Sequence, residues 1–173
     1  MRQDPVAIFE GTGAMFTHTR QVPVNPDPQA PQLDAHDVWL GLMMKANNAL
    51  PFVPQLTKCD VIESGADWLI RDVELKGEMM REKVTFSPET SVRFNRLSGP
   101  EPGEITNVIE TDEEGNLALR FSFELSRVGL EDGSQAEREH FAPMEPAYHS
   151  AVESTLAAMR RVVEERGREG LQP

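Results

Sequence analysis

The sequence has too few cysteines for a disulfide-stabilised fold. Cys59 is the only cysteine in 173 residues, which excludes an internal disulfide and a cysteine-rich zinc site. The four histidines are scattered, without the His-x-x-x-His or His-plus-carboxylate spacing of a metal site. We therefore expect no metal and no cofactor, and the low cysteine content favours a cytoplasmic protein.

Long apolar runs are also absent. The most hydrophobic stretch, "VWLGLMM" at residues 38–44, is less than half of the roughly 20 residues that a membrane-spanning helix needs. The first residues, "MRQDPVAIFEGTG", contain acids and a proline and no long apolar core, unlike a secretory signal peptide. The sequence therefore predicts no membrane insertion.

Basic residues are scarce. The chain has 17 Lys and Arg against 29 Asp and Glu, a formal net charge of −12. This negative net charge repels a phosphate backbone, and the sequence has no compact cluster of basic residues that would bind one. We therefore expect no nucleic-acid partner. A glycine-rich phosphate loop and a serine nucleophile elbow are missing too. None of the common catalytic motifs therefore identifies a reaction.

The length and the 39% hydrophobic content are typical of one globular domain. Residues 1–14 have little periodicity and are predicted to form a flexible N-terminal arm, and residues 15–170 are predicted to form the domain. The domain begins with an alternating segment at residues 15–23 that ends in prolines, as an edge strand does.

A helix is expected next, capped by Asp34 or Asp37. Two prolines, Pro51 and Pro54, then leave room for at most one short second helix. The pattern changes to period two from residue 57 to 128, with six candidate strands joined by short turns, which favours antiparallel hairpins. The acidic segment "EDGSQAERE" at residues 131–139 is expected to be a mobile loop or frayed turn.

The last element is a long amphipathic helix that starts near Pro146 and ends near Gly167. About 20 residues of helix span about 30 Å, enough to lie across a sheet. The order predicts an α+β helix-grip fold. In it, a seven-stranded curved antiparallel sheet wraps around the long C-terminal helix, and two short helices follow the first strand.

Several stretches carry a resemblance to a known family: "VPVNP", "VWLGLMMKAN", "FVPQLTKCDVIE", "LIRDVEL", "EKVTF" and "GNLALRFSFE". With them the chain resembles the AtaL-like family, a domain of unknown function in the START/Bet v 1-like (SRPBCC) superfamily, over roughly residues 15–170. The resemblance implies a helix-grip fold and a pocket for a small, largely apolar molecule. It implies no reaction, because the superfamily contains lipid carriers, hormone receptors, polyketide cyclases and stress proteins.

Polar residues interrupt the apolar inner face of the predicted sheet. The "KG" turn at residues 76–77 sets Arg71 opposite Glu82, and the next hairpin sets Arg96 beside Glu82. A "DEEGN" turn sets Asn107 against Phe121. Because an isolated buried charge costs several kcal/mol, these residues need partners.

Three interpretations of this polar group remain open. Arg71 and Glu82 can be a structural pair, with Arg96 reaching water. They can form a polar patch that receives a ligand oxygen, since arginine presents a rigid fork of donors. They can also form an acid–base site in which Glu82 accepts a proton.

Three functions follow, in this order of preference. The first is a binding protein for a small hydrophobic or amphipathic molecule, with an enclosed pocket of several hundred Å³. The second is a polyketide cyclase- or dehydratase-like enzyme that uses Glu82 with Arg71 and Arg96. The third is an interaction module without a ligand, and either a monomer or a homodimer fits the sequence. The residues expected to line the cavity are Trp39, Met43, Phe52, Leu69, Arg71, Val73, Met80, Glu82, Val84, Phe94, Arg96, Asn107, Phe121, Phe123, Tyr148, Val152 and Met159.

Overall fold

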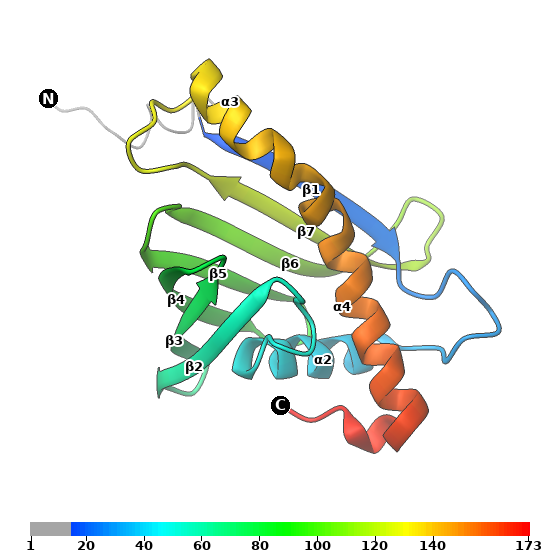
Figure 1. Cartoon of the computed structure of the whole chain (residues 1–173). Helices are drawn as coiled ribbons and strands as arrows, with labels where there is room; N and C mark the ends of the chain where they lie inside the picture. The colour runs from blue at the N-terminus through cyan, green and yellow to red at the C-terminus, as the bar shows by residue number, and fades with distance from the viewer. Residues whose placement is uncertain (1–14) are drawn as a thin grey trace, which may run out of the picture.

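The computed structural model describes residues 15–173, and the predicted arm at residues 1–14 lies outside the described residues. One antiparallel sheet holds seven strands in the order β1-β7-β6-β5-β4-β3-β2 (Figure 1). The strands are β1 (Phe16–Pro23), β2 (Leu56–Ser64), β3 (Trp68–Leu75), β4 (Glu78–Ser87), β5 (Ser91–Ser98), β6 (Gly103–Thr111) and β7 (Leu117–Leu125). The predicted strand number and antiparallel pairing are confirmed.

The helices are α2 (Ala35–Asn47), α3 (Gln135–Phe141) and α4 (Glu145–Arg166), with the short 3-10 turns η1 (Ala142–Met144) and η2 (Arg168–Gly170). Figure 1 shows α4 crossing one face of the sheet, where it packs on β1 and β7, while α2 packs on β2, β5 and β6. This arrangement of a long C-terminal helix on a curved sheet is the predicted helix-grip fold.

The connection after β1 contains one helix rather than two. Helix α2 begins with a capping box in which Asp34 accepts from the backbone N–H of Asp37, and Asp37 accepts from that of Asp34, each at 2.8 Å. Both predicted capping residues are thus used. The expected second short helix is present only as turns, with Val53 N–H donating to the Ala49 carbonyl at 2.9 Å, because prolines 51 and 54 supply no N–H donor.

The N-cap of α2 leads to a first testable prediction. Replacing Asp34 by alanine should lower the free energy of unfolding by about 1 kcal/mol, because the Asp37 N–H in the first turn of α2 loses its side-chain acceptor. Urea unfolding followed by circular dichroism measures this change. A loss within the error of the wild-type value would contradict the capping role.

Helix α2 reaches α4 across a glycine. A Cβ built on Gly41 would lie 2.6 Å from Met159 Cγ and Sδ, so a larger side chain would require the Met159 side chain to move. Val38 and Leu42 of α2 pack with Leu156 of α4 in the same buried cluster. The apolar "VWLGLMM" stretch is therefore a core helix that also closes one end of the sheet.

The segment expected to be a mobile loop contains helix α3, so that prediction is wrong. Ser134 is its N-cap and accepts from the Glu137 N–H at 3.1 Å. Glu137 is buried and accepts from the Gly133 N–H at 2.9 Å. Phe141, at the end of α3, is buried and stacks on Phe16 of β1 with ring centroids 4.6 Å apart. The "SQAE" capping pattern and this aromatic anchor order the segment.

Candidate functional site

A cavity of about 160 Å³ lies between the sheet, the C-terminal half of α2 and the start of α4. Its walls are mainly apolar, with Val73 and Met80 from the β3–β4 hairpin and Phe121 and Phe123 from β7. Its rim includes two exposed residues, Gln55 before β2 and Lys76 in the β3–β4 turn.

The cavity is smaller than the several hundred Å³ expected from the sequence. Four aromatic residues, Phe94, Phe121, Phe123 and Tyr148, are among those that line it. A cavity of about 150 Å³ is known to hold a benzene molecule, whereas drug-sized ligands occupy about 300–1,000 Å³. The enclosed part therefore takes one ring-sized group, and a longer molecule would extend through the rim.

Nine of the predicted residues line the cavity. They are Arg71, Val73, Met80, Glu82, Phe94, Arg96, Phe121, Phe123 and Tyr148. The other eight do not line it and need correction: Trp39, Met43, Phe52, Leu69, Val84, Asn107, Val152 and Met159. Seven of them are buried and Met43 is partly buried, so these side chains fill the core instead of bordering open space.

The predicted polar group is present, and its three charged heads are in contact. Arg71 pairs with Glu82 and Glu82 with Arg96 in the register expected from the two turns. Arg71 Nε donates to Glu82 Oε1 at 2.9 Å, and Arg96 Nε donates to Glu82 Oε2 at 3.5 Å. All three side chains are at most 7% exposed.

Arg71 also joins the sheet to the end of α2. Its Nη1 donates to the carbonyl oxygens of Lys45 and Ala46, at 2.9 and 2.8 Å. These carbonyls belong to the last turn of the helix, where a cation also stabilises the negative end of the helix dipole. Arg71 therefore has a structural role as well as a place in the cavity wall.

Glu82 is ionised in this environment. Burial by itself raises the pKa of its carboxyl group, but Arg71 and Arg96 outweigh that effect and the pKa is lowered. A carboxylate held in this way is a weak base. The geometry therefore does not favour the predicted role of Glu82 as a proton acceptor.

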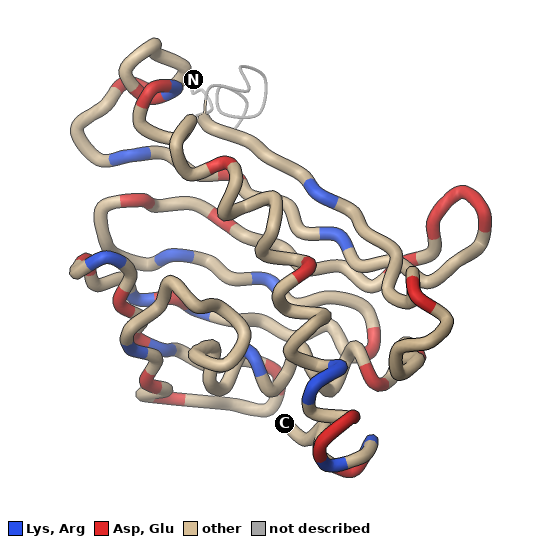
Figure 2. Tube along the Cα trace, turned by 45° about the vertical axis from the view of Figure 1, so that its right-hand side comes forward, with Lys and Arg blue, Asp and Glu red and all other residues tan. Residues whose placement is uncertain are grey.

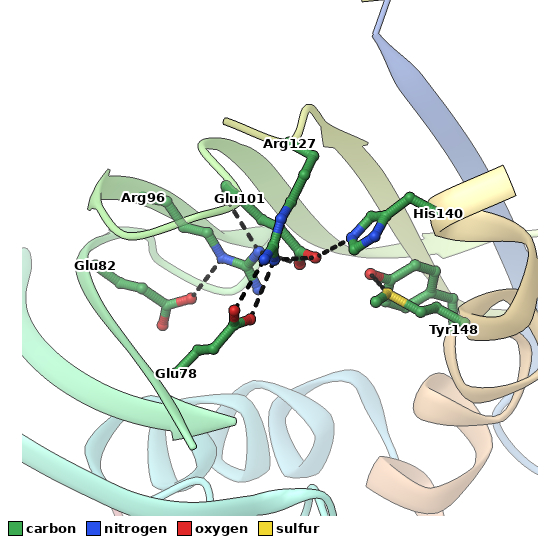
Figure 3. A network of polar contacts seen from close by, with 8 residues as sticks. Glu78, Glu82, Arg96, Glu101, Arg127, His140 and Tyr148 are labelled. Atoms are coloured by element: carbon green, nitrogen blue, oxygen red, sulfur yellow. Dashed lines mark hydrogen bonds and ion pairs between the residues drawn. The ribbon is translucent and has the colours of Figure 1, made fainter. Parts of the chain in front are cut away.

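The polar network continues beyond the predicted residues (Figure 3). Arg96 Nη1 donates to the Glu101 carbonyl at 3.2 Å, and its guanidinium lies 3.7 Å from Glu101 Oε1. Glu101 Oε2 contacts Arg127 Nη1 at 3.3 Å and His140 Nε2 at 2.8 Å. Glu101 lies in the "GPEPG" turn, where no periodicity indicates which side chains face inward. Sequence reasoning therefore missed it.

Lys45 is a second residue that the sequence reasoning missed. Its side chain is buried, with 6% of the residue exposed, and it lines the cavity. Its Nζ donates to Asn107 Oδ1 at 2.9 Å and lies 4.3 Å from the centre of the Phe121 ring and 5.1 Å from that of Phe94. Among residues 15–173 it has no ion pair with a carboxylate. Lys45 follows Leu42 by three residues, and residues with this spacing lie on the same face of a helix. This spacing was the signal in the sequence that Lys45 faces inward.

The amine of Lys45 titrates near neutral pH. Burial lowers its pKa, the positive charge of Arg71 lowers it further, and Glu82 offsets only part of this, so that the pKa is about 7. An amine of this kind exists at pH 7 partly in its neutral form, which can accept a proton or act as a nucleophile.

Tyr148 contributes a neutral hydroxyl to the cavity. Burial raises the pKa of its phenol to about 12, and its ring stacks on Phe123 with centroids 4.5 Å apart. The hydroxyl donates to Met144 Sδ at 3.6 Å. Because a thioether is a weak acceptor, the hydroxyl remains able to donate to a ligand oxygen.

Elsewhere on the described residues no second site of this kind is evident. Figure 2 shows Lys and Arg interspersed with Asp and Glu along the strands, rather than gathered in one stripe. Within residues 15–173 there is no group of three ligating side chains that could hold a metal ion. None of the described helices is long and apolar enough to span a membrane.

Comparison with solved structures identifies the fold. The chain is similar to the Zhui aromatase/cyclase from Streptomyces sp. R1128, at 16% identity and a TM-score of 0.63 over 86% of this chain and 94% of that one. It is also similar to StfQ, a di-domain aromatase/cyclase from the steffimycin pathway, at 12% identity and a TM-score of 0.62 over 92% of this chain. That match covers 55% of StfQ, so this chain spans about half its length.

Comparison with curated protein sequences finds no match. A family model does match, over residues 18–166. It is that of AtaL, described as acetylaranotin biosynthesis cluster protein L. The resemblance seen in the sequence is thereby confirmed, and the chain belongs to the AtaL family.

Proposed function

We propose that this protein binds a small, largely apolar molecule whose oxygen-bearing end points toward Lys45 and Arg71. The observation that carries the proposal is a cavity with apolar walls and basic groups at its inner end. Apolar pockets with a few convergent polar groups are the usual form of small-molecule sites.

The charges favour a ligand with oxygen acceptors. Arg71 and Arg96 both contact the carboxylate of Glu82, and Arg96 also lies near Glu101. Lys45 adds a third basic group, held by a neutral amide. Arg71 Cζ and Lys45 Nζ lie 5.0 and 5.1 Å from the same Phe94 ring centre, so both border one region. A carbonyl, enol or carboxylate oxygen placed there would accept from these donors.

The size of the cavity limits the ligand. About 160 Å³ accommodates one ring with a polar substituent, and further rings would pass between the start of α4 and the β3–β4 turn. The presence of a cavity counts against a pure interaction module, which needs no open space inside the fold.

An enzyme that acts on a polyketide-type substrate is the second candidate. Two solved structures with the same fold are named aromatase/cyclases, although the low identity extends only to the fold. In such an enzyme Lys45 is better suited than Glu82 to move a proton, because its pKa is near 7 while that of Glu82 is lowered.

A variant that blocks the cavity tests the binding function. Ala147 of α4 lines the cavity. Ala147→Trp should reduce the amount of small molecule that co-purifies, detected by native mass spectrometry, and weaken the binding of 2-naphthoate, measured by calorimetry. The matched control is Ala157→Trp, on the same helix and also half-buried but away from the cavity.

The expected result is binding to the wild type and to Ala157→Trp, with at least about a tenfold weaker affinity in Ala147→Trp, since a filled cavity forfeits roughly 1.4 kcal/mol or more. Equal affinity in all three proteins would place the bound molecule elsewhere and contradict the proposal.

A further inference from the structure

The amine of Lys45 combines access to the cavity with an unusual set of neighbours. It is fixed at 2.9 Å from Asn107 Oδ1 and flanked by the rings of Phe94 and Phe121. The three other lysines of the chain, Lys58, Lys76 and Lys83, are exposed. Lys45 is therefore the one buried lysine of the chain, and its amine lies beside two aromatic rings.

The surroundings act against an ammonium ion at this position. Two aromatic rings attract a cation by about 0.5–2 kcal/mol, but removing an ammonium ion from water costs several kcal/mol. Arg71 lies beside the same Phe94 ring and repels a second positive charge. The lowered pKa of Lys45, about 7, agrees with this balance.

Lysines become nucleophiles in proteins by these two means, desolvation in an apolar pocket and proximity to another cation. A neutral amine attacks a carbonyl carbon, whereas an ammonium ion has no free electron pair to do so. The same position would give a structural lysine little benefit, because an apolar side chain of similar length would fill it without the cost of burying a charge.

We propose that Lys45 forms an imine with a ketone or aldehyde group of the molecule that occupies the cavity. The proposal rests on the binding function above and narrows the ligand to a carbonyl compound. The electron pair of Nζ forms a bond to the carbonyl carbon, and the carbonyl oxygen takes up a proton to give a carbinolamine. The C–O bond then breaks, and the oxygen leaves as water with the two hydrogens that the neutral amine carried.

Other residues around the cavity have positions that suit this step. Asn107 Oδ1 accepts from Nζ and so orients the amine, which makes Asn107 a positioning residue. Tyr148 can donate to the carbonyl oxygen of a bound molecule. The apolar walls limit the access of water, which would otherwise hydrolyse the imine.

Reductive trapping tests the proposal. The wild-type protein is incubated at pH 7 with 2-naphthaldehyde and sodium cyanoborohydride, which converts an imine to a stable secondary amine, and the modified residues are mapped by peptide mass spectrometry. Lys45 should be modified at least about tenfold faster than any exposed lysine, because an ordinary lysine is almost wholly protonated at this pH. The rate at Lys45 should level off above about pH 7.

Two variants test which amine reacts. Lys45→Met should lose the adduct, whereas Lys83→Met, which changes an exposed lysine outside the cavity lining, should retain the adduct at the wild-type rate. Binding of 2-naphthoate by the wild type without an adduct at Lys45 would overturn this inference and leave the binding function intact. Absence of 2-naphthoate binding together with no adduct would overturn both.

Discussion

Replacing Glu82 by glutamine should lower the free energy of unfolding by about 3–5 kcal/mol, the range observed when one partner of a buried ion pair is removed. Glu82 contacts both Arg71 and Arg96, and a neutral amide would leave Arg71 buried without a countercharge and Arg96 with only Glu101, 3.7 Å away. For a chain of this length the melting temperature should fall by about 10 °C. Thermal and urea unfolding measure the two quantities.

A matched control lies one residue away on each strand. Asp72 and Arg81 form the next cross-strand pair of β3 and β4, with Arg81 Nε donating to Asp72 Oδ1 at 2.8 Å. This pair points to the opposite face, where the side chains are 26% and 48% exposed. Because exposed ion pairs contribute about 0–1 kcal/mol, Asp72→Asn should change little. Similar losses in both variants would contradict the view that burial makes the Glu82 cluster important.

The hairpin registers could be predicted from the sequence because they depend on local chemistry. Short turns and period-two alternation together fix which residues face each other. The pairs Arg71–Glu82, Glu82–Arg96 and Asn107–Phe121 are found as predicted. The two-helix connection and the loop at residues 131–139 were less well predicted, although the capping pattern at Ser134 was readable.

The remainder of the site depends on contacts between distant segments. Lys45 meets Asn107 across 62 residues, and Glu101 meets His140 across 39. No local pattern indicates such contacts. The volume of the cavity depends on how closely α2 and α4 pack on the sheet, and the contact between Gly41 and Met159 also joins segments far apart in the sequence. Composition and periodicity therefore predicted part of the cavity lining but not the volume of the cavity.

Lys45 should make the stability of the protein depend on pH. Its pKa is about 7 in the folded state, against 10.5 for an ordinary lysine, so between these values the unfolded chain binds more protons at this residue. Stability linked to Lys45 therefore rises as pH rises from about 7 toward 10, and the full cost of burying the charge is present below pH 7. Relative to Lys45→Met, the wild type should gain about 2 kcal/mol between pH 7 and pH 9, measured by urea unfolding at each pH.

The comparison between variants isolates this effect from other titrating groups. Arg71, Glu82 and Asn107 face Lys45 in both proteins, so their contributions largely cancel when the Lys45→Met curve is subtracted. Lys83→Met provides the control, because Lys83 lies on β4 and its side chain remains exposed to solvent in the folded protein. Its curve should run parallel to that of the wild type. If the Lys45→Met curve were also parallel, Lys45 would keep its proton in the folded protein at pH 9, and the basis for a nucleophilic amine in the cavity would be lost.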